Sequence, residues 1–470
     1  MFAIACFIHS AHGKSALKVE SSGDAKSVRF QVFPSKPAEA GILELLDDQT
    51  GDCLQTVHAG FFSSGQVFSL AKNHRVKPGR LRVRYRQGIQ LAVDQELSPP
   101  RGVDWVNPCD LVWTGKALYV LDSGRTKVRR GKDDSEPARI VAAGKTCVWK
   151  FLPDGKPDPG FADGGRLVIR DKPSAIRSLT VDEQGVLYVP LGGHYIKVQE
   201  HQEGWSDQTV VGGFNAVDGW VTVPSGGGYV ETWDSSGNRL PRTVGGYDRS
   251  GDADFWSAKG RNTQHINSVA LGPDHRIYLH VGEYAVIRVY DRTISGLDGC
   301  LYTSTENASL GGSLPRCIAS NRMGAVYLAT ANRQIIKLGD DGKEIKIAYA
   351  SEAEPRMILP TGLSVSGDLL WVAANGADVP YWDSGGGEAV FLYWDNGGEL
   401  LPVESYGKAG TKREGIEFMN PSATAQSSDH LTLWVAEDGM SNADGPPGNA
   451  RVRRFKITST ESEEVAFTLK

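Results

Sequence analysis

The chain has 470 residues, of which 40% are hydrophobic and 23% charged, and its formal net charge is −5. This length suits one large domain with a smaller one, or a ring of repeats. The 55 glycines and 11 tryptophans favour a turn-rich β protein. The densest basic run is KVRRGK at 127–132, and acidic residues follow it directly. The sequence therefore has no continuous basic stripe. The composition therefore argues against a nucleic-acid partner.

The N-terminus begins with a seven-residue apolar run, FAIACFI at 2–8, followed by small and polar residues. This order resembles a short secretory signal peptide without its basic part, so we expect residues 1–23 to be a signal or processed segment. It predicts export to the periplasm, the medium or the cell surface, with a mature N-terminus between residues 11 and 17. A mis-chosen start codon and a buried first strand are the alternatives. The run is too short to span a bilayer, and no transmembrane segment is predicted elsewhere.

Residues 24–96 form a separate unit in the sequence. Short stretches alternate apolar and polar residues between DxxTG and KPG turns, which predicts a small β-sandwich. The DxxTG turn and the stretch PGRLRVRY resemble the FlgD-type Ig-like domain, and that resemblance implies a spacer module. The segment LSPPRG lies within 97–104, which is the expected linker.

Six copies of one pattern follow the linker. In each copy an apolar strand leads into a turn of Gly, Asp or Asn, and a second strand then carries an aromatic residue before Val or Leu. The aromatic markers are Tyr119, Tyr188, Tyr278, Tyr327, Trp371 and Trp434. Most copies continue with a third strand that has a basic residue between aliphatic ones: VWKF (148–151), YIKV (195–198), VIRV (286–289), IIKL (335–338) and VRRF (452–455).

Each copy predicts an antiparallel sheet that is apolar on both faces. Radial stacking of such sheets covers both faces and leaves few exposed edges, so we expect residues 105–470 to form a β-propeller. Six blades are favoured. The stretch YVETWDSSGNRLP (229–241) is either the outer hairpin of the second blade beyond a long insertion or part of a seventh blade. The fold class is therefore all-β, a propeller with a small N-terminal Ig-like sandwich.

The repeat resembles the NHL type, in which a strand is followed by G-x-h-Y-V and then by a basic residue between aliphatics. The stretch FLPDGKPDPGFADGGRLVI (151–169) is likewise similar to the outer hairpin of bacterial propeller repeats. The NHL resemblance implies the fold more than the function, because that family includes binding modules, lactonases and lyases.

The turns between first and second strands are short, whereas long polar insertions lie in the second turns, as at 376–388 and 438–449. Insertions of this kind usually carry binding, so we place the working surface on the channel face that bears them. The expected ligand is a small molecule, a glycan or a protein. The ligand-binding candidates are Arg177, His194, His265, Asn267, Arg316, Tyr381 and Trp382.

Metal binding and catalysis are less well supported by the sequence. Oxygen ligands from Asp122, Asn267, Glu283 and Asn420 are weak candidates for calcium. Imidazoles of His194, His265 and His280 are weak candidates for zinc, as in the amidating-lyase propellers that the repeat resembles. No GxSxG motif is present. A binding propeller is the preferred function, and a lyase or a lactone or glycan hydrolase on the same face is the alternative.

The six cysteines contain no CxxC pair. Cys109 with Cys147, and Cys300 with Cys317, could pair in an oxidising compartment, and buried free thiols are the alternative.

Overall fold

The computed structural model describes the strands and the turns close to them. The residues described are 16–21, 27–36, 39–71, 76, 79–100, 103–128, 139–142, 144–171, 176–191, 194–197, 220–223, 228–246, 266–281, 286–303, 315–321, 324–330, 334–338, 345–349, 360–374, 388–409, 415–438 and 450–469. Within these ranges the chain is built of strands and turns, with a 3-10 turn at Leu297–Gly299.

Five four-stranded antiparallel sheets follow one another along the chain. In each sheet the strands are ordered from inner to outer as they occur in the sequence. In blades one and two, a separate two-stranded hairpin comes between the second and the third strand of the sheet. Blade one contains β7 (Pro108–Trp113), β8 (Leu118–Asp122), β11 (Thr146–Phe151) and β12 (Arg166–Arg170). Blade two contains β13 (Thr180–Val181), β14 (Leu187–Pro190), β17 (Tyr229–Trp233) and β18 (Arg239–Gly245). Blade three contains β19 (Ile266–Leu271), β20 (Arg276–Val281), β21 (Val286–Asp291) and β22 (Cys300–Thr303).

Blades four and five repeat this order. Blade four contains β23 (Pro315–Ser320), β24 (Val326–Thr330), β25 (Gln334–Leu338) and β26 (Ile345–Tyr349). Blade five contains β27 (Pro360–Ser366), β28 (Leu369–Ala374), β29 (Ala389–Asp395) and β30 (Leu400–Tyr406).

Blade six is assembled from both parts of the chain. Its inner strands are β33 (Pro421–Gln426), β34 (Thr432–Glu437) and the first half of β35 (Arg451–Leu469), and its fourth strand is the second half of β6 (Gly79–Leu97). A strand that precedes blade one thus completes the last blade. This pairing ties the two ends of the ring together.

The apolar clusters show that the sheets form a closed ring. The marker Tyr119 of blade one packs with Leu179 and Leu187 of blade two, and Trp434 of blade six packs with Leu118 and Val120 of blade one. The other markers share a cluster with the next blade in the same way, and all six are buried. The prediction of a β-propeller is confirmed, and the described sheets of the ring number six. The aromatic markers are the side chains that fill the space between blades.

The structure places two stretches whose position in the repeat was open or misassigned. The stretch 229–241 supplies β17, the turn after it and the start of β18, so it belongs to the outer hairpin of blade two, as the first alternative held. YIKV was wrongly taken as a third strand of the ring. Its first three residues lie in β15 (His194–Lys197), and Val198 is outside the described residues. Among the described strands, β15 pairs with β16 (Trp220–Val223) alone, in a separate hairpin. The strand pattern is the same in both settings, and only the partner strand distinguishes them.

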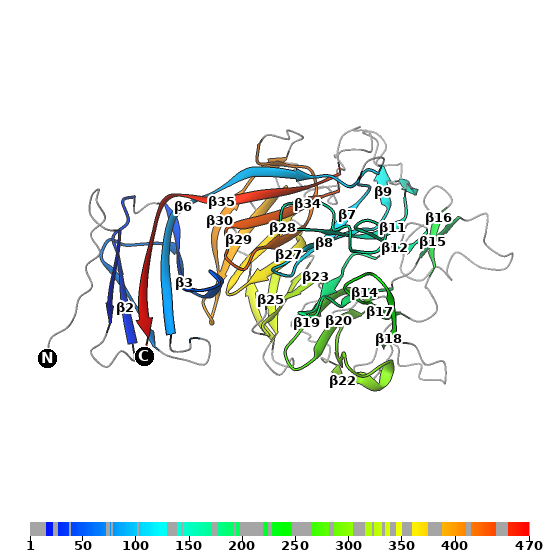
Figure 1. The fold of residues 1–470 in the computed structure, drawn as a ribbon, viewed down its shortest axis with the longest axis horizontal. Coiled ribbons are helices and arrows are strands. Elements are labelled where there is room, and N and C mark those ends of the chain that lie inside the picture. The colour runs from blue at the N-terminus through cyan, green and yellow to red at the C-terminus, as the bar shows by residue number, and fades with distance from the viewer. Residues whose placement is uncertain are drawn as a thin grey trace.

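The N-terminal unit is a sandwich of two sheets. One sheet contains β1 (Leu17–Ser21), β2 (Ser27–Val32) and β5 (Gln66–Ala71). The other contains β3 (Ala40–Asp47), β4 (Cys53–Phe61) and the halves of β6 and β35 that lie outside blade six. Figure 1 shows these two long strands running from the ring across to the sandwich.

These ranges differ from the expected division in two respects. Leu17 belongs to the sandwich core, although it lies within the segment 1–23, and so does Leu469, although it lies in the range assigned to the propeller. A second cluster joins Ile42 and Ile89 to Trp371 and Leu433, so the sandwich also packs against blades five and six. The linker expected at 97–104 stays a prediction, and the strands that the two units share define a test of it.

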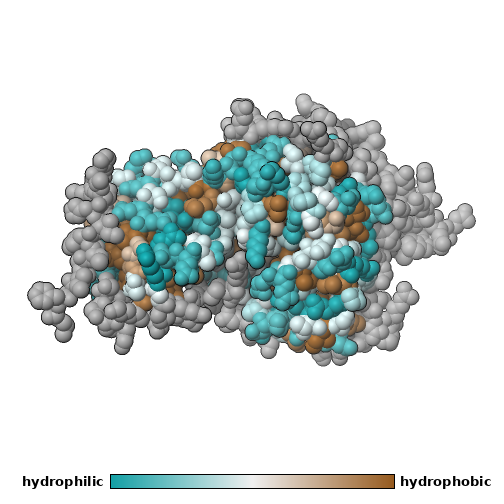
Figure 2. All heavy atoms as spheres, in the orientation of Figure 1, coloured by the Kyte–Doolittle hydropathy of each residue, from teal (hydrophilic) through white to brown (hydrophobic). Residues whose placement is uncertain are grey.

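The surface drawn in Figure 2 has hydrophobic residues in separate groups among hydrophilic ones. Among the described residues, no helix is long and apolar enough to cross a bilayer. Cysteines 53, 109, 147, 300 and 317 are all free thiols, so the pairings considered for the four in the ring are not formed.

Candidate functional site

Hydrogen bonds between inner strands hold neighbouring blades in register around the axis. Asp110 in blade one accepts a bond from the backbone N–H of Leu179 in blade two (2.7 Å). Ser178 accepts from Val269 N–H of blade three (3.1 Å), and Ser268 accepts from Ile318 N–H of blade four (3.0 Å). A small or short polar residue at this position lets the inner strands approach closely.

A β-bulge stands next to this position in five of the six described blades. The register shifts just after the first residue of β7, β19, β23, β27 and β33. The bulged residues are Cys109, Asn267, Arg316, Thr361 and Ser422. In blade two, Arg177 takes the corresponding place, because it precedes Ser178 as Asn267 precedes Ser268. Bulges at the rim of a closed sheet commonly redirect a side chain toward a site.

Three of these six residues join blades. Thr361 donates to the carbonyl of Pro421 in the next blade (2.5 Å), and Ser422 donates to the carbonyl of Pro108 (2.6 Å). The Cys109 thiol lies 3.6 Å from the carbonyl of Ile176. Their short side chains bond to the backbone of the neighbouring blade, which is a structural role.

The other three are long polar residues in successive blades: Arg177, Asn267 and Arg316. Arg177 and Asn267 are exposed to solvent. Arg316 is placed by its backbone at the bulge of β23. The rim of blades two to four therefore carries two arginines and an asparagine at equivalent positions. The first residue of an inner strand pairs with the last residue of the second strand, as Pro108 does with Asp122, so these residues lie at the edge where the second turns begin.

The remaining sequence candidates fall elsewhere. His194 lies in the β15–β16 hairpin, outside the six ring sheets. His280 is buried within β20. Outside the described residues are His265, Glu283, Tyr381 and Trp382.

Asp122 and Asn420, two of the weak calcium candidates, are buried parts of the framework. Asp122 accepts bonds from the N–H groups of Val106, Asn107 and Gly124 at 2.9 Å, and its burial raises the pKa of the carboxyl. Asn420 has a φ of +50°, a left-handed conformation that Asn tolerates better than most residues. Its N–H donates to Glu388 at 3.4 Å.

Glu388 is a feature of this edge that the sequence reasoning missed. It is buried at the start of blade five's third strand, and burial raises the pKa of its carboxyl to about 7. Nearby Asp438 and Glu437 act in the same direction. Glu437 itself is paired with Arg451 (2.8 Å) and Arg453 (2.7 Å). Its only signal in the sequence is an acidic residue between the run GGG and the strand AVFLYWD.

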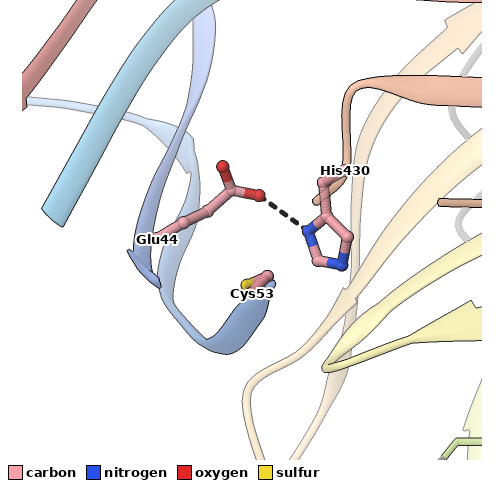
Figure 3. A group of neighbouring side chains, drawn as sticks. All are labelled: Glu44, Cys53 and His430. Carbon is pink, nitrogen blue, oxygen red and sulfur yellow. Dashed lines mark hydrogen bonds and ion pairs between the residues drawn. The ribbon is translucent and has the colours of Figure 1, made fainter. Parts of the chain in front are cut away.

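A second group of ionisable residues lies between the sandwich and the ring. Figure 3 shows Glu44, Cys53 and His430, whose potential ligand atoms lie within 4.8 Å of one another. Both Arg84 (2.8 Å) and Arg86 (3.0 Å) pair with Glu44. Burial raises the pKa of the Cys53 thiol well above its usual range, although metals bind the thiolate. Two guanidinium charges and a protonated thiol do not suit a divalent cation.

No family model matches the chain, and no curated protein matches it. Two solved structures are similar in fold at 9% sequence identity. The WD40 repeats of RRP9 have a TM-score of 0.40, with 78% of this chain and 99% of that chain covered. The structure of U3-55K has a TM-score of 0.39, with 79% and 98% covered. The ring described above, which contains six sheets in the described part of the chain, makes this protein a β-propeller joined to a β-sandwich.

Proposed function

We propose that this protein is an exported binding propeller that holds an anionic small or glycan-like ligand at the rim of blades two to four. The observation that carries the proposal is the succession of Arg177, Asn267 and Arg316 at the bulge position of three neighbouring blades. A guanidinium binds a carboxylate through two parallel hydrogen bonds, and an amide binds hydroxyl groups. A uronic acid or another carboxylate-bearing sugar presents both groups.

The finer parts of this proposal come from the sequence. The NHL-like repeat and the FlgD-like N-terminal unit agree with an extracytoplasmic binding module on a spacer. The apolar run at 2–8 supports export. Protein recovered from its host is expected to begin between residues 11 and 17, and N-terminal sequencing that finds intact Met1 on a cytosolic protein contradicts export.

Binding is tested by calorimetry with oligomers of a uronic acid, using full-length protein. Arg177→Ala and Arg316→Ala are each expected to weaken binding about 10-fold or more, because each removes a charge-assisted hydrogen bond. The control is His275→Ala, in the exposed turn of blade three at the opposite end of the strands. If His275→Ala loses binding and both arginine variants bind normally, the ligand site lies on the opposite face and the proposed location is wrong.

An enzyme on the same face is the second candidate, and Glu388 favours it. A carboxyl with a pKa of about 7 can act as a general acid near neutral pH, which suits a lyase or a glycan or lactone hydrolase. Glu388→Gln is then expected to abolish turnover and to retain ligand binding. Metal analysis of the purified protein for calcium and zinc completes this test, since stoichiometric metal favours the enzyme. Unchanged turnover in Glu388→Gln rules this residue out.

A further inference from the structure

A chain of hydrogen bonds joins a carboxylate, an imidazole and a hydroxyl at the junction of the sandwich and the ring. Nδ1 of His430 lies 2.7 Å from Oε1 of Glu44. Nε2 of His430 lies 2.9 Å from Oγ of Ser366. The three residues come from β3, the β33–β34 turn and the end of β27, and only the tertiary structure brings them together.

The protonation states follow from these contacts. Burial raises the pKa of the Glu44 carboxyl, but Arg86 and Arg84 outweigh that effect and hold it below its usual range. Glu44 is therefore a carboxylate, which only accepts hydrogen bonds, so Nδ1 of His430 carries a proton. In the neutral imidazole Nε2 is then the acceptor, and the Ser366 hydroxyl donates to it. These are the tautomer and the direction of bonding that a Ser–His–acid triad requires.

The surroundings of Ser366 suit a nucleophile better than those of a buried structural serine. Glu44 and His430 are fully buried, whereas Ser366 is partly exposed at the end of its strand. Ser366 pairs with Leu369, so Gly367 and Asp368 make a two-residue turn directly after it. Gly367 has a φ of +59°, and a Cβ built there lies 3.6 Å from Cε1 of His430. The imidazole is thus packed against the turn. In hydrolases with a nucleophile on a sharp turn, the N–H of the following residue binds the oxyanion, and here that residue is Gly367.

We propose that Ser366, His430 and Glu44 form an acyl-transfer site in which Ser366 is the nucleophile, His430 the general base and Glu44 the residue that orients the imidazole. Ser366 Oγ forms a bond to the carbonyl carbon of an activated ester while its proton passes to Nε2 of His430. That proton then leaves with the alcohol or phenol as the C–O bond breaks. Water, deprotonated by the same imidazole, hydrolyses the acyl-serine and restores the hydroxyl.

The two guanidiniums beside Glu44 limit the rate. They oppose the positive charge that develops on the imidazole in the transition state, because like charges repel in a site of low dielectric. The site is therefore expected to react with activated esters and with phosphonylating reagents rather than with amides. It lies at the end of blade five opposite the rim residues, so it is independent of the proposed ligand site.

The test uses full-length protein and a fluorophosphonate probe, with peptide mapping by mass spectrometry. Attack by Ser366 forms a P–O bond and breaks the P–F bond, and the proton taken up by His430 accompanies the fluoride. We expect one adduct, at Ser366, that is absent from Ser366→Ala. The matched control is Ser364→Ala, on the same strand, whose hydroxyl bonds Thr424 at 2.9 Å and no imidazole. This control should label at the wild-type rate.

His430→Asn tests the base, and Asn tolerates the φ of +58° at this turn. Labelling is expected to slow by about 100-fold or more, the usual contribution of a general base. Labelling of folded wild-type protein is also compared with labelling in denaturing urea, which needs no variant. An activated serine loses its reactivity when the protein unfolds, whereas an ordinary serine is unreactive in both states. Absence of the Ser366 adduct from folded wild-type protein overturns the proposal, and so does wild-type labelling in a folded His430→Asn variant.

Discussion

Leu97 stands opposite Val452 in the ladder between β6 and β35, and the same ladder continues to Gly79 and Leu469 in the sandwich. One pair of strands therefore completes blade six and also forms one side of a sandwich sheet, in which β6 pairs with β3. The hydrogen bonds of this ladder bridge the expected linker. Cleavage of the chain near residue 100 leaves all of them in place.

We therefore predict that trypsin cleavage after Arg101 does not separate the two parts. The fragments should run as two bands on a denaturing gel and elute as one species in size-exclusion chromatography, because the β6–β35 ladder and the shared apolar cluster survive the cut. Separate elution of the two fragments under native conditions contradicts the shared-strand arrangement and supports a detachable sandwich.

Loss of Glu44 should destabilise the fold strongly. Glu44→Gln removes the negative charge that faces Arg84, Arg86 and His430. It leaves the buried Arg86 guanidinium without its carboxylate partner, and Arg84 keeps the more distant carboxylate of Glu464, at 3.8 Å. We expect a loss of about 3–5 kcal/mol in the free energy of unfolding, measured with denaturant. The control is Glu20→Gln, whose exposed carboxylate pairs with Lys18 at 2.7 Å and should contribute about 1 kcal/mol or less. If the two changes lower the free energy of unfolding equally, the buried ion pairs of Glu44 contribute no more to stability than an exposed pair.

Glu388 should make stability depend on pH. Its carboxyl has a pKa of about 7 in the folded protein and an ordinary value near 4.5 when unfolded. Between these values the folded state holds more protons than the unfolded state, so the free energy of unfolding falls as pH rises through this window and levels off above it. Glu388→Gln should gain stability relative to wild type as pH increases from 4.5 to 7. The exposed Glu399→Gln, in the same blade, should follow the wild-type curve in urea titrations.

Gly362 should be intolerant of a side chain. A Cβ at this position lies 2.6 Å from the carbonyl oxygen of Ser422 in the next blade. Gly362→Ala must push blades five and six apart, and we expect a loss of about 1–3 kcal/mol, seen as a lower melting temperature. Gly398→Ala, where the nearest atom is 3.6 Å away on the side chain of Asn396, is the matched change. A melting temperature for Gly362→Ala no lower than that of Gly398→Ala refutes the close approach.

The sequence by itself determined the propeller. Each copy places an aromatic residue such as Tyr188 or Trp371 at one fixed place in a strand that is apolar on both faces, and only neighbouring sheets on both sides can bury such a strand. The equivalent residues Arg177, Asn267 and Arg316 were found for the same reason, because the local pattern fixes their position in the repeat.

Tertiary structure alone decided how the two parts join and where ionisable groups meet. β6 and β35 read as ordinary alternating strands, and alternation does not name a partner several hundred residues away. Glu44, Ser366 and His430 share no motif and no spacing. Their contact depends on the sandwich packing against blades five and six, an arrangement that arises only when the chain closes on itself.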